Sequence, residues 1–598
     1  MSYAAPLADM RFVLEEVAGL DDLARLPGYE VASPDLVEAI LVEAAKLAET
    51  ELAPLNQTAD HTGSLLENGV VRTPPGFREA YARYVAGGWN GLSFDSEYGG
   101  QGLPLALAIP VAEMWNSACM SFALCPLLTV GAVELLKAHG SAEQKQRYLA
   151  KLVTGEWTGT MNLTEPQAGS DLGALRTRAV PARNARWGEH YRLTGQKIFI
   201  TYGDHDLAPN IIHMVLARSP EAPPGSRGIS LFLVPKFLPD GEGGVGSRND
   251  IRTLSLERKL GIHASPTCVL AYGEDEGAVG WRIGEENRGL EYMFTMMNAA
   301  RLNVGLQGVA IAERAYQQAR DFARTRVQGR PLGVAPSVEV PPIIHHPDVR
   351  RMLLWMRAAT EAMRSLAYYA AALIDQGRRH PDATVRWAAQ RRADLLIPVV
   401  KAWCTDLGVA VASTGIQVHG GMGYIEETGA AQHLRDARIA PIYEGTNGIQ
   451  ANDLVGRKLA RDRGEAASEL IAEMRATVQA LGRARSADLT AVAQPLGEGL
   501  AALDTATSFL VEAAPALAAA GSVPYLQLLG TICGGWLTAR MALASEHRSA
   551  EKDGNPAFLC AKRLTARFYA EHFMALAPGY LMAVVGGSTV LNFDPDQL

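Results

Sequence analysis

The feature that most constrains this 598-residue chain is a block of strand patterns enclosed by two long helical regions. Between 156 and 285, short runs rich in branched and aromatic residues are separated by glycine and proline, as in β-strands. On either side, apolar residues recur at helical spacing. The chain is therefore predicted to be α+β, with a mainly helical domain at 1–155, a small β domain at 156–285 and a helical domain at 286–460.

Helix start signals support the helical parts. Ser33 can cap a helix whose first turn contains Pro34, and Ser141 with Gln144 forms a capping-box pattern. After 460 the sequence becomes rich in alanine and leucine, again at helical spacing. The segment 461–598 is predicted to be an additional helical domain packed on the main body.

Composition and the chain ends restrict the class of protein. The six cysteines lie far apart without a C-x-x-C pair, so neither a disulfide framework nor a metal site is expected. The N-terminus lacks a basic start followed by an apolar run, and the late apolar stretches are short and broken by glycine. A net charge of -8 opposes binding to nucleic acid. We expect a cytoplasmic protein with no transmembrane segment and no nucleic-acid partner.

Glu444 poses the main question of the sequence. In APIYEGTNGIQ it stands between a tyrosine and a Gly-Thr-Asn-Gly turn. The carboxylate could be solvated, could cap the following helix, or could act as a base whose reach is set by the turn. The stretch alone leaves these alternatives open.

Two segments of the β domain combine hydroxyls with small or flat residues. In MNLTEPQAGSDLGALRT, Thr164 and Ser170 flank a loop in which backbone N–H groups could approach a phosphate or a ring edge. A polar turn explains the same residues equally well. In GQKIFIT, Phe199 and Thr201 share one face of a strand, which suits a flat heterocycle, although a core Phe beside a surface Thr is the simpler interpretation.

A glycine-rich turn, QVHGGMGYIEE at 417–427, lies between predicted helices. No strand precedes it and no βαβ unit surrounds it, so a dinucleotide-binding Rossmann loop is a weak interpretation. Its N–H groups could face a diphosphate, or the glycines could simply end a helix.

In their order along the chain, these segments resemble the acyl-CoA dehydrogenase family over 33–460. The matching stretches are FDSEYGGQG, HGSAEQKQRYLAKLVTGEW, LTEPQAGSD, GQKIFIT, ERKLGIHASPT, QVHGGMGY and RDARIAPIYEGTNGIQ. The resemblance implies an N-terminal helical domain, a middle β-barrel-like domain and a C-terminal four-helix bundle. It also implies FAD held between the subunits of a homodimer or homotetramer. The added C-terminal domain resembles a long bacterial branch of the family.

The resemblance implies a reaction as well: α,β-dehydrogenation of an acyl-CoA thioester to the trans-2-enoyl-CoA, with an electron-transferring flavoprotein as acceptor. Glu444 would abstract the α-proton while a hydride leaves the β-carbon for flavin N5. Its backbone N–H and a ribityl hydroxyl of FAD would polarise the thioester oxygen. A few branches carry the base immediately before the arginine that is here Arg301, but that position is Ala300.

The same matching assigns the binding residues. Cofactor-binding positions are Thr164, Gly169, Ser170, Phe199, Thr201, Arg326, Gln328, Gln417, Gly420, Gly421, Thr446 and Gln450, several of them across the subunit interface. Substrate-binding positions are Ser170, Asn298, Arg301, Tyr443 and Gly445. Phe199 replaces a common Trp and Asn298 a common Asp. The chain also lacks the Phe of the family's Arg-x-Gln-Phe-Gly pattern, which weakens the assignment of Gln328.

Two other functions share this fold. An acyl-CoA oxidase would use the same glutamate but pass electrons to O2, and the added C-terminal domain makes it the first alternative. A DNA-binding flavoprotein is the second, and the acidic net charge opposes it.

Overall fold

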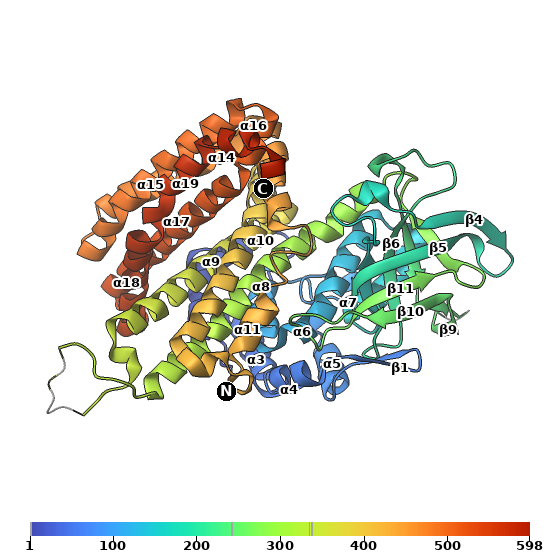
Figure 1. Ribbon diagram of the computed structural model, residues 1–598, viewed down its shortest axis with the longest axis horizontal. Helices are drawn as coiled ribbons and strands as arrows, with labels where there is room; N and C mark the ends of the chain where they lie inside the picture. Colours follow the sequence, from blue (N-terminus) through green and yellow to red (C-terminus); the bar gives the residue numbers. More distant parts are fainter. Residues whose placement is uncertain (1–2, 241–242, 334, 336–338, 598) are drawn as a thin grey trace.

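The computed structural model describes residues 3–240, 243–333, 335 and 339–597. Figure 1 shows a β domain at one end of the molecule, a long helical bundle in the middle and a further set of helices at the other end. The predicted α+β class, with three domains of this kind and an added helical domain, is confirmed.

The N-terminal region is built on α6 (Leu105–His139), a largely buried helix whose backbone leaves helical geometry at Cys119. Both predicted helix starts are confirmed: Ser33 caps α3 with Pro34 in its first turn, and Ser141 and Gln144 form the capping box of α7. The elements before the β domain are α1 (Leu7–Glu16), α2 (Leu20–Leu23), α3 (Pro34–Leu47), α4 (Leu55–Thr62), β1 (Leu65–Glu67), β2 (Val70–Arg72), α5 (Phe77–Ala86), α6 and α7 (Ala142–Thr154).

The β domain is an eight-stranded sheet in the order β10-β11-β5-β12-β7-β6-β3, with β4 paired to β5. Its strands are β3 (Thr158–Asn162), β4 (Arg178–Asn184), β5 (Gly188–Thr201), β6 (Ile211–Ala217), β7 (Ser230–Pro235), β10 (Ile251–Leu256), β11 (Thr267–Tyr272) and β12 (Ala278–Ile283). A separate pair, β8 (Phe237–Pro239) and β9 (Val245–Arg248), lies beside it. The long strand β5 pairs with β4, β11 and β12, so it joins the two halves of the sheet.

The middle bundle consists of α8 (Gly289–Thr325), α9 (Pro347–Arg379) and α10 (Ala383–His419), followed by α11 (Ala430–Ala437) and α12 (Asn447–Asp453). Glycines allow α8 and α10 to approach closely: a Cβ on Gly308 would lie only 2.2 Å from the Cys404 carbonyl oxygen. Gly305 meets Val400 in the same way, so the two helices run parallel. This packing brings the first part of α8 beside the middle of α10.

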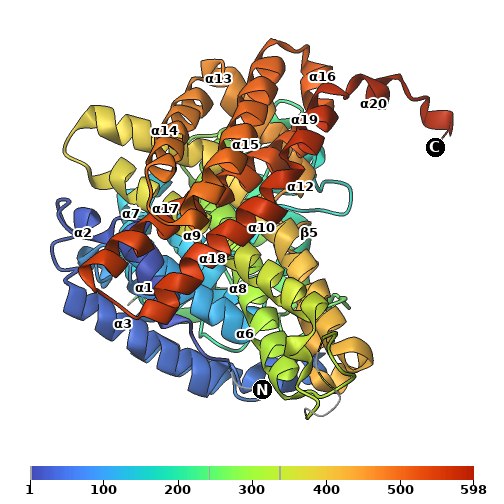
Figure 2. The same ribbon diagram turned by 90° about the vertical axis from the view of Figure 1, so that its left-hand side faces the viewer.

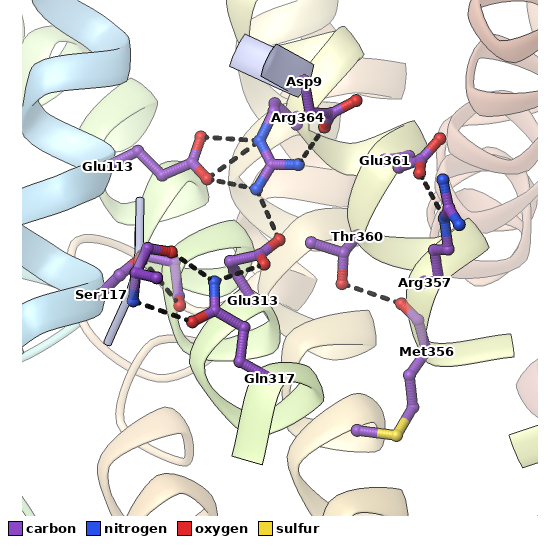
Figure 3. Close-up of polar contacts among 12 residues, drawn as sticks. Asp9, Glu113, Ser117, Glu313, Gln317, Met356, Arg357, Thr360, Glu361 and Arg364 are labelled. Carbon is purple, nitrogen blue, oxygen red and sulfur yellow. Dashed lines mark hydrogen bonds and ion pairs between the residues drawn. The ribbon is translucent and has the colours of Figure 1, made fainter. Parts of the chain in front are cut away.

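The C-terminal helices pack on α9, α10 and α12, as Figure 2 shows. They are α14 (Glu465–Gly482), α15 (Ala487–Glu512), α16 (Pro515–Ala520), α17 (Ser522–Glu551), α18 (Pro556–His572), α19 (Ala577–Val585) and α20 (Ser588–Asn592). One link to the body is a cluster of buried charges. Arg364 of α9 pairs with Asp9, Glu113 and Glu313, and Lys562 of α18 pairs with Asp9 and Glu361. Figure 3 shows the carboxylates around Arg364.

By length and composition alone, three helical segments of the described chain could cross a membrane: Leu105–His139, Ala383–Tyr424 and Pro556–Asn592. In the first two, 89% and 78% of the apolar window is buried inside the fold, whereas in the third only 22% is. These apolar windows are longer than the short, glycine-broken stretches expected from the sequence.

Candidate active site

Glu444 lies in the loop between α11 and α12. Its φ of +58° is uncommon for a residue with a side chain, and Gly445 follows at +86°. The loop is closed by Gln450, whose Nε2 donates to the carbonyl oxygens of Glu444 at 3.3 Å and Gly445 at 3.2 Å. A Cβ at position 445 would lie 2.7 Å from that same nitrogen, so the turn requires glycine. Thr446 then caps α12.

The surroundings of Glu444 make it a weak acid. Burial raises the pKa of this carboxyl to about 7, although the positive charges of Arg301 and Lys401 oppose the shift. Arg301, from α8, is only 3% exposed, and its Nη1 lies 3.4 Å from Asp453 Oδ2 and 3.2 Å from Asn298 Oδ1. A carboxyl with such a pKa, close to neutral pH, can both lose and accept a proton there.

Lys401 of α10 is the residue at this site that the sequence analysis missed. It is fully buried, and its Nζ donates to Asn447 Oδ1 at 2.8 Å. Burial lowers the pKa of this ammonium to about 7, with Glu444 and Asp406 opposing the shift. A signal was available, because Lys401 is the only charge in the apolar run LLIPVVKAWC.

Tyr443 and the backbone of Glu444 complete the loop. The Tyr443 hydroxyl donates to Gln307 Oε1, and burial raises its pKa. Within the described part of the chain, the backbone N–H of Glu444 donates to no acceptor. An unpaired backbone donor is one of the groups from which an oxyanion-binding site is built.

The predicted flavin residues of the β domain form one group. The side chains of Thr164 and Thr201 are partly buried, and neither hydroxyl has a hydrogen-bond partner in the described chain. Phe199 is 58% exposed and has a φ of +60°, where two residues of β5 oppose one residue of β11. Gly169 and Ser170 lie exposed on the neighbouring loop. Open hydroxyls and an exposed ring fit a flat polar heterocycle.

Glu165 holds that loop in place, which the sequence analysis also missed. Its carboxylate accepts hydrogen bonds from the backbone N–H groups of Arg176 at 2.6 Å and Thr177 at 3.0 Å, and from Lys197 Nζ at 2.8 Å. Burial alone would raise the pKa of Glu165, but Lys197 and these donors outweigh burial and hold the pKa at about 2. The carboxylate is therefore ionised and fixes the position of Thr164.

Two of the remaining predicted flavin residues, Thr446 and Gln450, lie in the Glu444 loop and at the start of α12, where Gln450 is buried. The other five form a second group at the far ends of α8 and α10, and all are exposed: Arg326, Gln328, Gln417, Gly420 and Gly421. Rings of Phe322 and His419 lie 4.5 Å apart there, so both helices end together. Arg326 is 25 residues beyond Arg301 along α8, which corresponds to roughly 37 Å at the helical rise. One chain therefore does not bring the second group to Glu444.

Comparison with known proteins identifies the family. Models described as acyl-CoA dehydrogenase N-terminal, middle and C-terminal domains match residues 35–156, 160–273 and 287–459, and a model described as acetyl-CoA dehydrogenase C-terminal like matches 470–593. The chain is 49% identical, over 96% of both proteins, to 3-methylmercaptopropionyl-CoA dehydrogenase of Ruegeria pomeroyi. The chain belongs to the acyl-CoA dehydrogenase family.

Two solved structures share the fold of this acyl-CoA dehydrogenase. A Bacillus anthracis acyl-CoA dehydrogenase complexed with FAD has a TM-score of 0.71 and 21% identity, covering 98% of this chain and 92% of that one. A Caenorhabditis elegans protein in complex with C11-CoA has a TM-score of 0.76 and 20% identity, covering 96% and 92%. The family predicted from the sequence is confirmed, and with it an oxidoreductase acting on CH–CH groups.

Proposed function

We propose that this enzyme dehydrogenates an acyl-CoA thioester between its α- and β-carbons, with FAD as cofactor and Glu444 as the base that takes the α-proton. The observation that carries the proposal is the geometry of the loop, in which a left-handed turn places the Glu444 carboxyl beside its own unpaired backbone N–H. Burial also raises the pKa of this carboxyl to about 7. A base with a pKa near the working pH combines a usable ionised fraction with a strong affinity for the proton.

The chain supplies the other groups that this step needs. The unpaired Glu444 N–H is free to donate to the thioester oxygen as negative charge develops there, which lowers the barrier to removing the α-proton. Gly445 leaves the approach to that N–H open. Arg301 and Lys401 stabilise the carboxylate form of the base before the reaction.

The residues of the two flavin groups fit FAD. Thr164 and Thr201 would bind the ring, Phe199 would stack on it, and the exposed loop at Gly169 and Ser170 suits phosphates. FAD, when bound, supplies the hydride acceptor that no side chain provides. Because the second group lies at the far end of α8, we propose that it serves the FAD of a second subunit, in a homodimer or homotetramer.

We further propose a short acyl chain as substrate. A cavity of about 70 Å³ lies between α5, α6 and α8, and its lining includes Trp89, Trp115, Pro126, Leu127 and Asn303. Asn303 follows Arg301 of the site by two positions on α8, so we propose that the acyl chain enters this cavity. It is far smaller than the ~300–1,000 Å³ typical of drug-sized ligand sites. The 49% identical relative is named for a short sulfur-containing acyl-CoA. Rates on acyl-CoA thioesters of increasing length should fall beyond short chains, and a preference for long chains would refute this assignment.

As in the sequence analysis, we propose a cytoplasmic enzyme with an electron-transferring flavoprotein as acceptor. The relatives named above are dehydrogenases, so neither the oxidase nor the DNA-binding alternative is retained. Turnover with O2 as the only acceptor should be slow. Rapid stoichiometric peroxide formation would contradict the choice of acceptor.

The decisive test is Glu444→Gln, which keeps the size of the side chain and the turn. FAD and acyl-CoA should still bind, while flavin bleaching by a good acyl-CoA under anaerobic conditions should slow by about 10²–10⁴-fold, toward the upper end because Ala300 offers no second carboxylate. A variant that bleaches within tenfold of the wild type would show that Glu444 is a structural residue.

A further inference from the structure

A chain of hydrogen bonds runs from the C-terminal domain to the catalytic loop. Gln527 of α17 donates from Nε2 to Asp406 Oδ2 at 2.8 Å. Asp406 Oδ1 accepts from Asn447 Nδ2 at 2.6 Å, and Asn447 Oδ1 accepts from Lys401 Nζ at 2.8 Å. Every link joins a donor to an acceptor at ordinary distance, so the four side chains fix one another.

Asn447 is the link between this chain and the base. It is the first residue of α12 and stands three positions after Glu444. Its Nδ2 also reaches the Ala402 carbonyl at 3.1 Å and Thr405 Oγ1 at 3.0 Å, which ties the loop to α10. A change in Asn447 would therefore disturb both the loop and the hydrogen bond of Lys401.

We infer that Lys401 is a positioning residue for the catalytic base Glu444, and that the C-terminal domain holds Lys401 in place through Gln527, Asp406 and Asn447. The inference rests on the proposed role of Glu444. It gives the added domain a part in the reaction, although that domain contributes no acid, base or nucleophile to the site.

The charges around Lys401 support this role. Glu444 faces it from the loop, Asp406 from α10 and Arg301 from α8, while Asp453 of α12 pairs with Arg301. On the far side, Arg438 acts on Asp406. Lys401 is thus shared between two carboxylates, and an ammonium beside Glu444 favours its ionised form, the form that accepts a proton. Each of the two charges shifts the pKa of the other group, so Lys401 and Glu444 titrate as a coupled pair.

The test is the pH dependence of flavin reduction in the FAD-loaded enzyme. The acid limb of this profile is the fall in the rate of flavin reduction at low pH, where the base becomes protonated. Lys401→Met removes the positive charge of the lysine, so the midpoint of the acid limb should move up by about 1–3 pH units. The rate should fall by about tenfold or more at pH 6 and recover at high pH. Gln527→Leu should shift the acid limb in the same direction but by less. In this variant Lys401 keeps its charge, but the hydrogen bond from Gln527 to Asp406 that helps to hold it in place is lost.

Two controls separate positioning from stability. Ser522→Ala removes the bond from Ser522 Oγ to Asn452 Oδ1 at 3.1 Å, another contact between α17 and α12, and should leave the limb unchanged. Lys562→Met removes another fully buried lysine, from the charge cluster in α18, and should lower stability without moving the limb. An acid limb of Lys401→Met within 0.3 units of the wild type, at about equal FAD content, would overturn the inference.

A second variant tests the same link at its middle. Asp406→Asn removes the carboxylate that accepts from Asn447 and Gln527 and that favours the ammonium form of Lys401, so the limb should move up, as in Gln527→Leu; a downward shift or no shift would count against the inference. The protonated carboxyl band of Glu444 in infrared difference spectra, assigned by its loss in Glu444→Gln, should titrate with the same shifts. If Glu444→Gln remains active the proposed base is wrong, whereas unshifted profiles with an inactive Glu444→Gln would refute only the role of Lys401.

Discussion

Two buried regions join the C-terminal domain to the rest of the enzyme, and they differ in how their charged groups are paired. In the cluster around Arg364, one guanidinium pairs with three carboxylates, Asp9, Glu113 and Glu313 (Figure 3). At the catalytic loop, the ammonium group of Lys401 has one hydrogen-bond partner in the described chain, the neutral amide of Asn447.

The backbone shows the same contrast. Asp9, Glu113, Glu313 and Arg364 all stand in regular helices. Glu444 instead has a left-handed backbone conformation. Direct ion pairs between regular helices are typical of structural clusters. Charges without a direct ion pair, beside a left-handed residue, are typical of sites where protons move.

The largest expected effect is that of Arg364→Met. It leaves three carboxylates without their common counter-charge, and breaking such a buried pair costs about 3–5 kcal/mol. The melting temperature should fall clearly while the acid limb of flavin reduction stays in place. Arg351→Met is the matched control, since that arginine of α9 is exposed and, among the described residues, forms an ion pair with Asp348 alone. A shifted limb in Arg364→Met would mean that the two regions are not independent.

Glu444→Gln should have the reverse effect on stability, and only at high pH. The folded pKa of Glu444, about 7, lies above the ordinary glutamate value, so the native state holds this proton more tightly than the unfolded chain. Its contribution to stability is full below about pH 4.5 and is lost as the pH rises through 7. Glu444→Gln has no such loss, which is about 3 kcal/mol for a pKa raised from 4.5 to about 7.

Melting temperatures at two pH values check this, because Glu444→Gln should match the wild type at pH 5 and exceed it at pH 8. Glu361→Gln is the comparison from the charge cluster. Its carboxylate bonds Arg357 and Lys562, so that variant should be less stable at both pH values. A Glu444→Gln variant less stable than the wild type at pH 8 would show that the carboxylate is compensated after all.

Sequence patterns predicted the parts of this contrast that are local. The caps at Ser33 and Ser141 depend on neighbouring residues, and Glu444 belongs to a continuous motif, so each could be found without the fold. Lys401 and Gln527 lie 43 residues before and 83 residues after Glu444, and only the packing of α10 and α17 brings them behind the loop. A regular strand pattern also did not predict the bulge at Phe199, because pairing register depends on the partner strand.

The smallest expected effect concerns that bulge, and it compares the backbone of the flavin site with that of the charge cluster. Phe199→Ala removes the exposed ring but keeps a side chain at a φ of +60°, whereas Phe199→Gly removes the ring and relieves the backbone. The glycine variant should therefore be more stable than the alanine variant by about 1 kcal/mol. Both should bind FAD more weakly than the wild type, and to a similar extent, because both lack the stacking ring.

In α9, two residues from Arg364, Ala362→Gly makes the same exchange in a relaxed helix and should cost about 0.5–1 kcal/mol. Thermal melts of these variants measure whether glycine is more stable than alanine at position 199 and less stable at position 362. FAD titrations of the two Phe199 variants measure the loss of binding. If Phe199→Ala equalled Phe199→Gly in stability, the left-handed backbone at Phe199 would carry no strain.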